Sequence, residues 1–578
     1  KSDRTSSIFP LFENDLTHDQ MVAYSSLVVL TPIKQSPSHN IVVIHREQGL
    51  DGDKLLHVAG GPHTGIIINK LCKHVPGDCS NHVELSFSVW LSDGNNRKQE
   101  KRTLKFTLRN DVELHHGRSV VHNFFKQLMS GFPKDYVSFM MRILKQLQHE
   151  FAEIQRIDIE FKLLSEEEQV PIPDAAQYDS GSEVEEVTVG HIQELLEHAF
   201  PNGLSVPVMA EALRTTEDEV IHYLGELEAL GIVCRVEDEW LRVDTRNVDA
   251  VARTVHGAQD QPTVAIITCL FVEKQAVDAL IEERSILHKY KSGGDSNVYS
   301  MGRIGHHRVV ATKLASIGDS REATTSAGSI TTRLLGNFQN IEHVFVVGVG
   351  GAVPHFTDAK RHARLGDVVV SASKPDAYIY CHDLIVDRKT DAFSGFAVRR
   401  WNPVDHIISR IVEDGSEEVM EKWNEMTTEA VRRLHDAGGD YDFSMPSADT
   451  DVLALPVGGG NVVVVPHPNQ ETRKGPEIHL GPIGALANFK RHFEETEEES
   501  VGTFRTKFGE EFELRALDAG FDSVIAAISG SRIDSWTLIR GIADYQHGLS
   551  RASKLWQAHA AARAAAMLRV VVERLPPP

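Results

Sequence analysis

The stretch V-G-V-G-G-A-V, residues Val347–Val353, decides the fold because it joins an apolar strand to a cluster of glycines. Outward from this stretch, strands and helices alternate through residues 262–578, and the alternation predicts an α/β domain with a mostly parallel sheet. The expected strands are Thr263–Thr268, Arg308–Leu314, Val344–Val349, Asp367–Ser371, Val462–Pro466 and Ser535–Ile542, and the expected helices are Val272–Glu283, Thr324–Leu335 and one from Arg551.

The glycines of this stretch would let the backbone turn sharply or pass close to a flat ligand. They form neither G-x-G-x-x-G nor a P-loop, so the standard dinucleotide and Walker sites are excluded. Taken alone, the cluster is also typical of a plain turn.

Two acidic residues follow expected strands of the same domain. Asp544 ends the motif R-G-I-A-D that starts at Arg540, and Glu273 follows the strand Thr263–Thr268. Because open α/β sheets bind ligands at the carboxyl ends of their strands, both acids are candidate site residues. The structural alternatives are a helix N-cap for Asp544 and a solvated first-turn acid for Glu273.

These motifs, with R-L-G-D-V-V-V-S at Arg364–Ser371 and an Ala-rich last helix, occur in a family order. Residues 262–575 resemble the nucleoside phosphorylase and nucleosidase superfamily, which includes the methylthioadenosine/S-adenosylhomocysteine nucleosidases. The resemblance implies a three-layer domain around the sheet. It also implies a homo-oligomer, a dimer or larger.

The resemblance implies a role for each matching residue. Asp544 matches the general acid at purine N7, Arg540 an arginine beside it, and Glu273 the acid that activates water. The base and ribose pocket matches Gly348, Val349, Gly350 and Gly351. The family's Met-Glu pair is altered here to a stretch in which Phe521 and Asp522 are expected to contact substrate, with Asp518 as a second candidate.

The implied chemistry fits these residue types. Cleavage of N9–C1′ leaves electron density on the purine and positive charge on the ribosyl ring. An acid at N7 relieves the first, and carboxylates near the ribose stabilise the second. A carboxylate at Glu273 would repel phosphate, so we expect hydrolysis, with phosphorolysis as the runner-up.

Basic side chains are dense between Met301 and Arg333, where the family has a short glycine loop. We expect Arg303, Arg308 and Arg321 to bind substrate phosphates. The layout also resembles eukaryotic relatives of bacterial defence nucleosidases, which implies release of adenine from ATP, leaving ribose 5-triphosphate, in a regulated immune-type effector. No metal is needed for cleavage, although Mg²⁺ would accompany a polyphosphate. The alternatives are a nucleoside-level nucleosidase or phosphorylase, acting on methylthioadenosine or adenosine, and a catalytically silent nucleoside sensor.

Charge divides the rest of the chain. Residues 1–165 hold 20 Lys and Arg against 18 Asp and Glu, and their pattern predicts an α+β domain of unassigned role. Residues 166–186 read as an acidic linker. Residues 187–250 resemble a winged-helix module, with Thr216 as an N-cap and Gly231 as a helix stop. Its third expected helix has no Lys or Arg, so we expect a protein partner, at this module or the N-terminal region, rather than nucleic acid.

Composition limits the other possibilities. The net charge is −22, no apolar run approaches the ~20 residues of a membrane helix, and the five cysteines include no C-x-x-C pair. We therefore expect a cytoplasmic protein without a membrane segment or a cysteine metal site.

Overall fold

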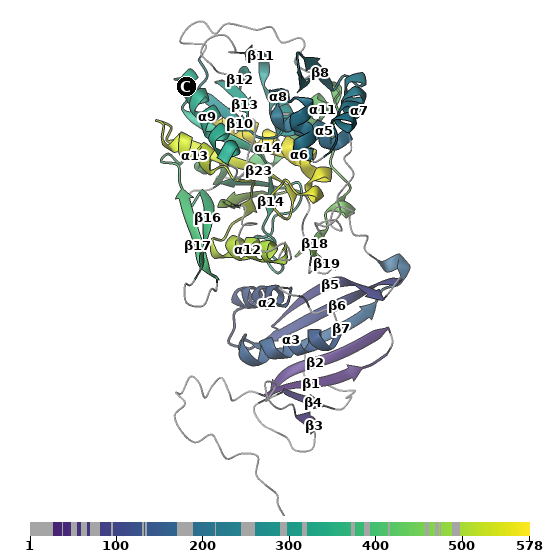
Figure 1. The fold of residues 1–578 in the computed structure, drawn as a ribbon. Coiled ribbons are helices and arrows are strands. Elements are labelled where there is room, and N and C mark those ends of the chain that lie inside the picture. Colours follow the sequence, from purple (N-terminus) through teal and green to yellow (C-terminus); the bar gives the residue numbers. More distant parts are fainter. Residues whose placement is uncertain are drawn as a thin grey trace, which may run out of the picture. The chain divides into compact units, whose positions relative to one another are not determined.

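The computed structural model forms two compact units (Figure 1). One consists of the described residues up to 169 with Phe356–Asp358 and Ala454–Pro468, and the other contains the remaining described residues. The structure describes residues 27–36, 38–47, 55–58, 66–69, 81–93, 96–129, 132, 136–169, 189–200, 202–213, 215–243, 261–288, 298–314, 321–371, 376–386, 393–413, 417–456, 462–468, 473, 475–487 and 498–578. Most of the predicted linker 166–186 therefore lies outside the described residues.

The first unit is built on a nine-stranded sheet with the order β18-β19-β5-β6-β7-β2-β1-β4-β3. Helices α2 (Leu114–Met129) and α3 (Tyr136–His149) pack on it through aromatic rings, among them Phe125 against Phe87 and Phe139 against Phe161. The strands are β1 (Leu27–Lys34), β2 (His39–Glu47), β3 (Leu55–Val58), β4 (Ile66–Asn69), β5 (His82–Asp93), β6 (Asn96–Leu108), β7 (Ile154–Leu163), β18 (Leu453–Pro456) and β19 (Val462–Val465).

The strand expected at Val462–Pro466 belongs to this sheet and not to the C-terminal one. It forms β19, which pairs antiparallel with β5 through Val463 opposite Val89. Its apolar run correctly indicated a buried strand, but the partner is a strand more than 350 residues earlier in the chain. The proposed boundary at residue 165 therefore does not separate the two sheets.

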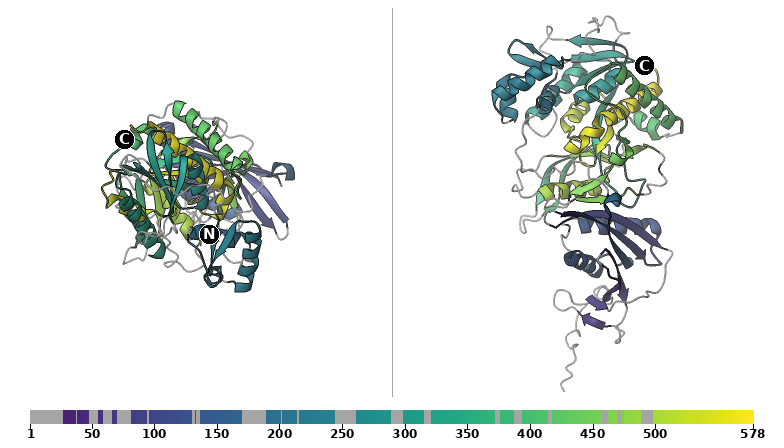
Figure 2. Two further views of the ribbon diagram at one scale, coloured as in Figure 1. Left: turned by 90° about the horizontal axis from the view of Figure 1, so that it is seen from above. Right: turned by 90° about the vertical axis from the view of Figure 1, so that its right-hand side faces the viewer.

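In the second unit, residues 189–243 form three helices and a hairpin, seen beside the larger sheet in Figure 2. These are α5 (Val189–Ala199), α6 (Val206–Leu213), α7 (Glu217–Ala229), β8 (Val233–Val236) and β9 (Glu239–Arg242). Thr216 caps α7 by accepting from the Glu219 amide, and Gly231 follows the helix with φ +71°, as predicted. The core is made of residues such as Ile192, Leu224 and Trp240. We call residues 189–243 the winged-helix module.

The rest of the second unit is built on a twelve-stranded mixed sheet. At its centre β13, β10, β14 and β23 lie side by side and run parallel. The flanks include antiparallel pairs, such as β11–β12, β12–β13 and β16–β17, so the sheet is less uniformly parallel than predicted. The strands are β10 (Val264–Thr268), β11 (Glu282–His288), β12 (Val298–Ile304), β13 (His307–Lys313), β14 (His343–Ala352), β15 (Val368–Ser371), β16 (Tyr378–Val386), β17 (Phe393–Trp401), β20 (Ile478–Gly481), β21 (Ile483–Leu486), β22 (Ala516–Leu517) and β23 (Ser535–Asp544).

Helix α14 (Lys554–Arg574) packs along β14 and β23 and against α8 and α11, while α9 packs against α13. Small side chains allow this close approach, because a Cβ on Gly541 of β23 would lie 2.0 Å from the Ala560 carbonyl oxygen. None of the helices in the described part of the chain is both long and apolar enough to span a bilayer. The other helices are α8 (Phe271–Leu280), α9 (Arg321–Asn337), α10 (Ile407–Glu413), α11 (Glu417–Asp436), α12 (Glu498–Glu511) and α13 (Asp522–Ser529).

Candidate active site

Glu273 connects the start of α8 to the central strand β14. Its Oε2 accepts hydrogen bonds from the amides of Cys269 and Leu270, each at 2.8 Å, and its Oε1 accepts from the Val349 amide at 2.8 Å. The side chain is 4% exposed, so the solvated first-turn alternative is wrong. Burial raises the pKa of Glu273, although the three amides and the nearby Arg540 oppose that rise.

Glycine is required at Gly348 and Gly351 of β14 because a side chain there would collide with neighbouring atoms, and not because of a positive φ angle. A Cβ on Gly348 would lie 2.3 Å from Oε1 of Glu273, and one on Gly351 would lie 2.5 Å from Oδ1 of Asp544. The same short stretch of backbone therefore meets Glu273 near one end and Asp544 near the other. The two acids singled out in the sequence lie at one edge of the sheet, as expected for the carboxyl ends of parallel strands.

Asp544 is the last residue of β23 and holds the turn that follows. Its Oδ1 accepts from the amides of Gln546 and Gly548 at 2.8 Å, and its Oδ2 accepts from the Ser550 amide at 3.2 Å and hydroxyl at 2.6 Å. With 2% exposure, the carboxylate is fully engaged by the protein. Asp544 thus holds a turn and is not a helix N-cap, because the next helical element begins only at Arg551. A proton transfer to a ligand would require one donor to leave. The Ser550 hydroxyl can do so by a single side-chain rotation.

Arg540 lies opposite Gly348 on the neighbouring strand and is completely buried. Its Nε donates to Oδ2 of Asp518 at 3.0 Å, its Nη1 donates to the Val346 carbonyl at 3.3 Å, and Phe521 stacks on the guanidinium with the ring centre 4.2 Å away. Nη2 lies 2.9 Å from the same Asp518 oxygen, but its N–H bonds are not aligned on any acceptor among the described residues. A buried donor of Arg540 thus remains without an aligned acceptor. The positive charge of Arg540 also acts on Glu273, where it partly opposes the rise in pKa that burial causes.

The structure gives Phe521 and Asp522 different surroundings from those expected. Phe521 covers Arg540, and its amide donates to the Tyr378 hydroxyl at 2.7 Å. Asp522 accepts from Trp401 Nε1 and Arg399 Nη1, both at 2.8 Å. These partners on β16 and β17 were missed in the sequence, and the only available signal was that a buried carboxylate needs a donor.

The structure places two of the predicted phosphate-binding arginines at the other edge of the sheet. Arg308 is at the start of β13, and Arg303 pairs with it across the β12–β13 hairpin. Because β13 runs parallel to β10, its site-side end is Lys313, about 17 Å along the strand from Arg308. These arginines are therefore not part of the cluster. Arg321 begins α9, and its side chain lies outside the described residues.

A buried lysine, Lys313, lies at the site-side end of β13 and is one of the basic residues noted in the sequence between Met301 and Arg333. Its Nζ donates to the carbonyls of Phe200 at 3.1 Å and Leu314 at 2.9 Å. Burial lowers the pKa of Lys313 to about 8, against the opposing charges of Cys269 and Glu273. Across the described residues, no group of three His, Cys, Asp or Glu side chains is arranged to hold a metal ion.

Three comparisons place this chain among known proteins. A family model described as a winged helix-turn-helix domain matches residues 178–244 and confirms the winged-helix interpretation of the middle region. A nucleotide-binding leucine-rich repeat (NLR)-like protein of Hyaloscypha variabilis is 24% identical over 336 residues, which are 56% of this chain and 30% of that protein. The chain thus spans about a third of the length of that relative.

The solved structures to which the chain is similar include two nucleosidases and a futalosine hydrolase. The Neisseria meningitidis 5′-methylthioadenosine/S-adenosylhomocysteine nucleosidase is 15% identical, with 54% of this chain and 100% of that chain covered and a TM-score of 0.31. The Streptococcus pyogenes S-adenosylhomocysteine nucleosidase is 15% identical, with 55% and 100% covered and a TM-score of 0.33. The Helicobacter pylori futalosine hydrolase is 14% identical, with 54% and 97% covered and a TM-score of 0.31. These likenesses alone assign no activity to this chain.

Proposed function

We propose that the chain hydrolyses the N9–C1′ bond of a purine nucleoside or nucleotide. The observation that carries this proposal is the pair of buried carboxylates, Glu273 and Asp544, that meet one glycine stretch of β14 from its two ends. Gly348 and Gly351 are three residues apart, which is about 10 Å along a strand. A base and its ribose are of that size, and in the proposal one substrate spans this stretch between the two acids.

In the proposed mechanism Glu273 takes a proton from water as the water oxygen bonds to C1′. Asp544 gives a proton to purine N7, and the electron pair of the broken bond stays on the purine. The raised pKa of Glu273 suits a base that works nearer neutral pH.

Arg540 is proposed to act beside this water. Its buried Nη2 has a donor that is not aligned on an acceptor among the described residues, and Asp518 holds the guanidinium through Oδ2, which faces Nε and Nη2. The carboxylate of Glu273 would repel a phosphate nucleophile at the same place, which supports hydrolysis over phosphorolysis. Phosphorolysis therefore remains only as the alternative to be tested.

The finer proposal, from the sequence, is that ATP is the substrate, with Mg²⁺ on its phosphates, in a regulated immune-type effector. The name of the NLR-like relative is in keeping with that role. The position of Arg303 and Arg308 at the far edge of the sheet favours a second candidate, hydrolysis of a nucleoside such as methylthioadenosine or adenosine. We further propose a cytoplasmic dimer or larger assembly whose N-terminal unit or winged-helix module binds a protein partner.

The test is to incubate the full chain with ATP, AMP, adenosine and methylthioadenosine, with and without phosphate, and to identify products by mass spectrometry. Adenine and a free ribose product in the absence of phosphate support the proposal, and Asp544→Ala should abolish them. Faster cleavage of nucleosides than of ATP would select the second candidate, and dependence on phosphate would select phosphorolysis. Calorimetric binding without base release, even at micromolar protein, would leave a nucleoside sensor instead.

A further inference from the structure

The winged-helix module contacts the helix turn that carries Glu273. We propose that Arg242 and Phe200 of this module are positioning residues for Glu273, an inference that rests on the function proposed above. The link between them is Phe271, the first residue of α8, two positions before Glu273.

Phe271 is held between two side chains of the module. The ring of Phe200 meets it edge to face with centres 5.3 Å apart, and the guanidinium carbon of Arg242 lies 4.8 Å from the centre of the Phe271 ring. Phe271 itself is buried. Such aromatic and cation–π contacts have preferred geometries, so they fix the direction of the ring as well as covering it.

Arg242 is in turn fixed by the module and by the core. Its Nε donates to Glu197 at 3.2 Å, and its Nη1 donates to the carbonyls of Ile232 at 2.8 Å and Val243 at 3.0 Å. Its Nη2 pairs with Asp440, which follows α11 in the core. The side chain is 3% exposed. A planar guanidinium with this many acceptors has one orientation available, and the Phe271 ring packs against it.

A second contact joins the module to the same edge of the sheet. The Phe200 carbonyl accepts the hydrogen bond from Nζ of Lys313, the last residue of β13. Next to it, β10 leads directly into the turn of Cys269 and Leu270, whose amides hold Glu273. The module therefore touches both the strand edge and the helix start that surround this carboxylate.

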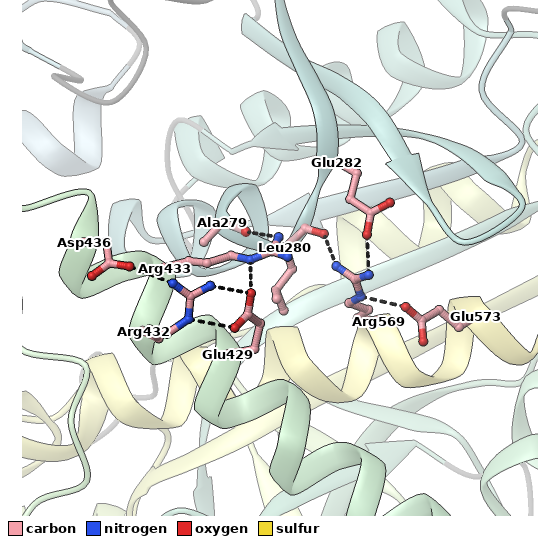
Figure 3. Close-up of polar contacts among 9 residues, drawn as sticks. All are labelled: Ala279, Leu280, Glu282, Glu429, Arg432, Arg433, Asp436, Arg569 and Glu573. Atoms are coloured by element: carbon pink, nitrogen blue, oxygen red, sulfur yellow. Dashed lines mark hydrogen bonds and ion pairs between the residues drawn. The ribbon is translucent and has the colours of Figure 1, made fainter.

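The other end of α8 is held by the core (Figure 3). Arg433 of α11 donates to the Ala279 carbonyl at 3.2 Å, and Arg569 of α14 donates to the Leu280 carbonyl at 3.0 Å. Glu429 orients Arg433, and Arg569 is held by Glu282 and Glu573, as the same view shows. These cations satisfy the last carbonyls of α8 and match the negative end of its dipole.

Because the last turn of α8 is fixed by α11 and α14, loss of the module's contacts would act mainly on its first turn. That turn carries Glu273 itself, and two of the three amides bound to Glu273 belong to Cys269 and Leu270 directly before it, while the third belongs to Val349 of β14. A shift of the first turn would therefore move Glu273 relative to the glycine stretch. A displacement of about 1 Å in such a group can cost roughly 100-fold in rate.

The experiment compares Arg242→Ala with Arg235→Ala in the full chain. Arg235 is on the paired strand of the same hairpin, is exposed, and contacts Glu237 and Asp238 of the same hairpin turn. Phe200→Leu is the milder second variant, because it keeps the backbone carbonyl bound to Lys313. Circular dichroism first confirms that each variant is folded.

We expect Arg242→Ala to lower kcat for base release by roughly 10- to 100-fold with KM within about threefold of wild type. Phe200→Leu should lower kcat less, Arg242→Lys should restore part of the loss, and Arg235→Ala should match wild type. In hydrogen–deuterium exchange, a peptide covering Cys269–Glu273 should exchange faster in Arg242→Ala than in Arg235→Ala.

Equal kcat values for the two alanine variants, or a rise in kcat for Arg242→Ala, would overturn the positioning role. Unchanged exchange in folded Arg242→Ala would do the same. The exchange measurement needs no activity, so it also separates the two proposals. If the wild type releases no base from any substrate, the proposed function fails, whereas an active wild type with unchanged exchange leaves the function and removes the inference.

Discussion

Gly348→Ala is the sharpest test of the proposed site, because it adds a single methyl group at the contact between β14 and Glu273. That methyl carbon would lie 2.3 Å from Oε1 and 2.6 Å from Cδ of Glu273. Since carbon atoms pack best near 3.5 Å, the carboxylate must retreat by about 1 Å. The 2.8 Å hydrogen bond from the Val349 amide would then stretch to roughly 3.8 Å and be lost.

Two measurable effects follow from this displacement. Overpacking should lower the free energy of unfolding by about 1–3 kcal/mol. Misplacement of the proposed base should lower kcat by on the order of 100-fold with little change in KM. Gly348 has no positive φ, so backbone strain does not contribute to either effect.

The assay is adenine release at saturating substrate, with urea unfolding measured alongside. Gly328→Ala on α9 is the matched control, because its methyl would find its nearest neighbour, the Ser523 carbonyl oxygen, at an ordinary 3.7 Å. It should leave kcat unchanged and the stability equal or slightly higher. The double variant with Glu273→Gln should be no slower than Glu273→Gln alone, since both changes disable the same group. The reasoning is refuted if Gly348→Ala stays within threefold of wild type, or if its effect multiplies with that of Glu273→Gln.

Other expected outcomes concern the two acids and the buried lysine. Asp544→Asn should slow base release by roughly 10²- to 10⁴-fold. Ser550→Ala removes the hydroxyl but keeps the backbone amide that also donates to Oδ2 of Asp544, so it should keep or raise the rate. Equal losses in the two variants would make Asp544 a turn anchor. Glu273 must be ionised to accept a proton, and burial raises its pKa, so kcat/KM should fall on the acidic side of its pH profile with an apparent pKa above 4.5. This acidic fall should vanish in Glu273→Gln. An apparent pKa at or below 4.5 contradicts the assignment. Burial lowers the pKa of Lys313 to about 8 in the folded protein, against 10.5 in the unfolded chain. Between these pH values the unfolded state binds more protons than the folded state, so the free energy of unfolding should rise with pH there. Lys313→Met should lack that rise in urea titrations at pH 7.5 to 10, and parallel curves would show that the lysine is not buried.

The central strands could be predicted from sequence because a strand covered on both faces is mostly apolar, as the fully buried strands β10 and β14 are. The same apolar signal does not say which sheet receives a strand. Val462–Val465 is as apolar as the others, yet it pairs with β5 through contacts that only the folded chain brings together.

For the candidate site, the sequence could predict which acidic residues belong to it and at which end of the parallel strands they lie. Glu273 and Asp544 both follow parallel strands, and their edge of the sheet follows from chain direction. Chain direction also argues against Arg308, since it starts an expected strand and so belongs at the amino edge. The partners of Asp522 could not be predicted, because Trp401 and Arg399 reach it from a strand over 100 residues away.

The sheet of the first unit is completed by β18 and β19, which are synthesised long after its other strands, and this delays complete folding of that unit. When synthesis has reached only residue 169, β19 has not yet been made, so β5 is left as an exposed edge strand. Unpaired edge strands can pair with strands of other chains, which leads to aggregation. Fragments that end near residue 169 are therefore expected to aggregate, and a nascent chain must shield the exposed edge of β5 until the segment around Val463 emerges.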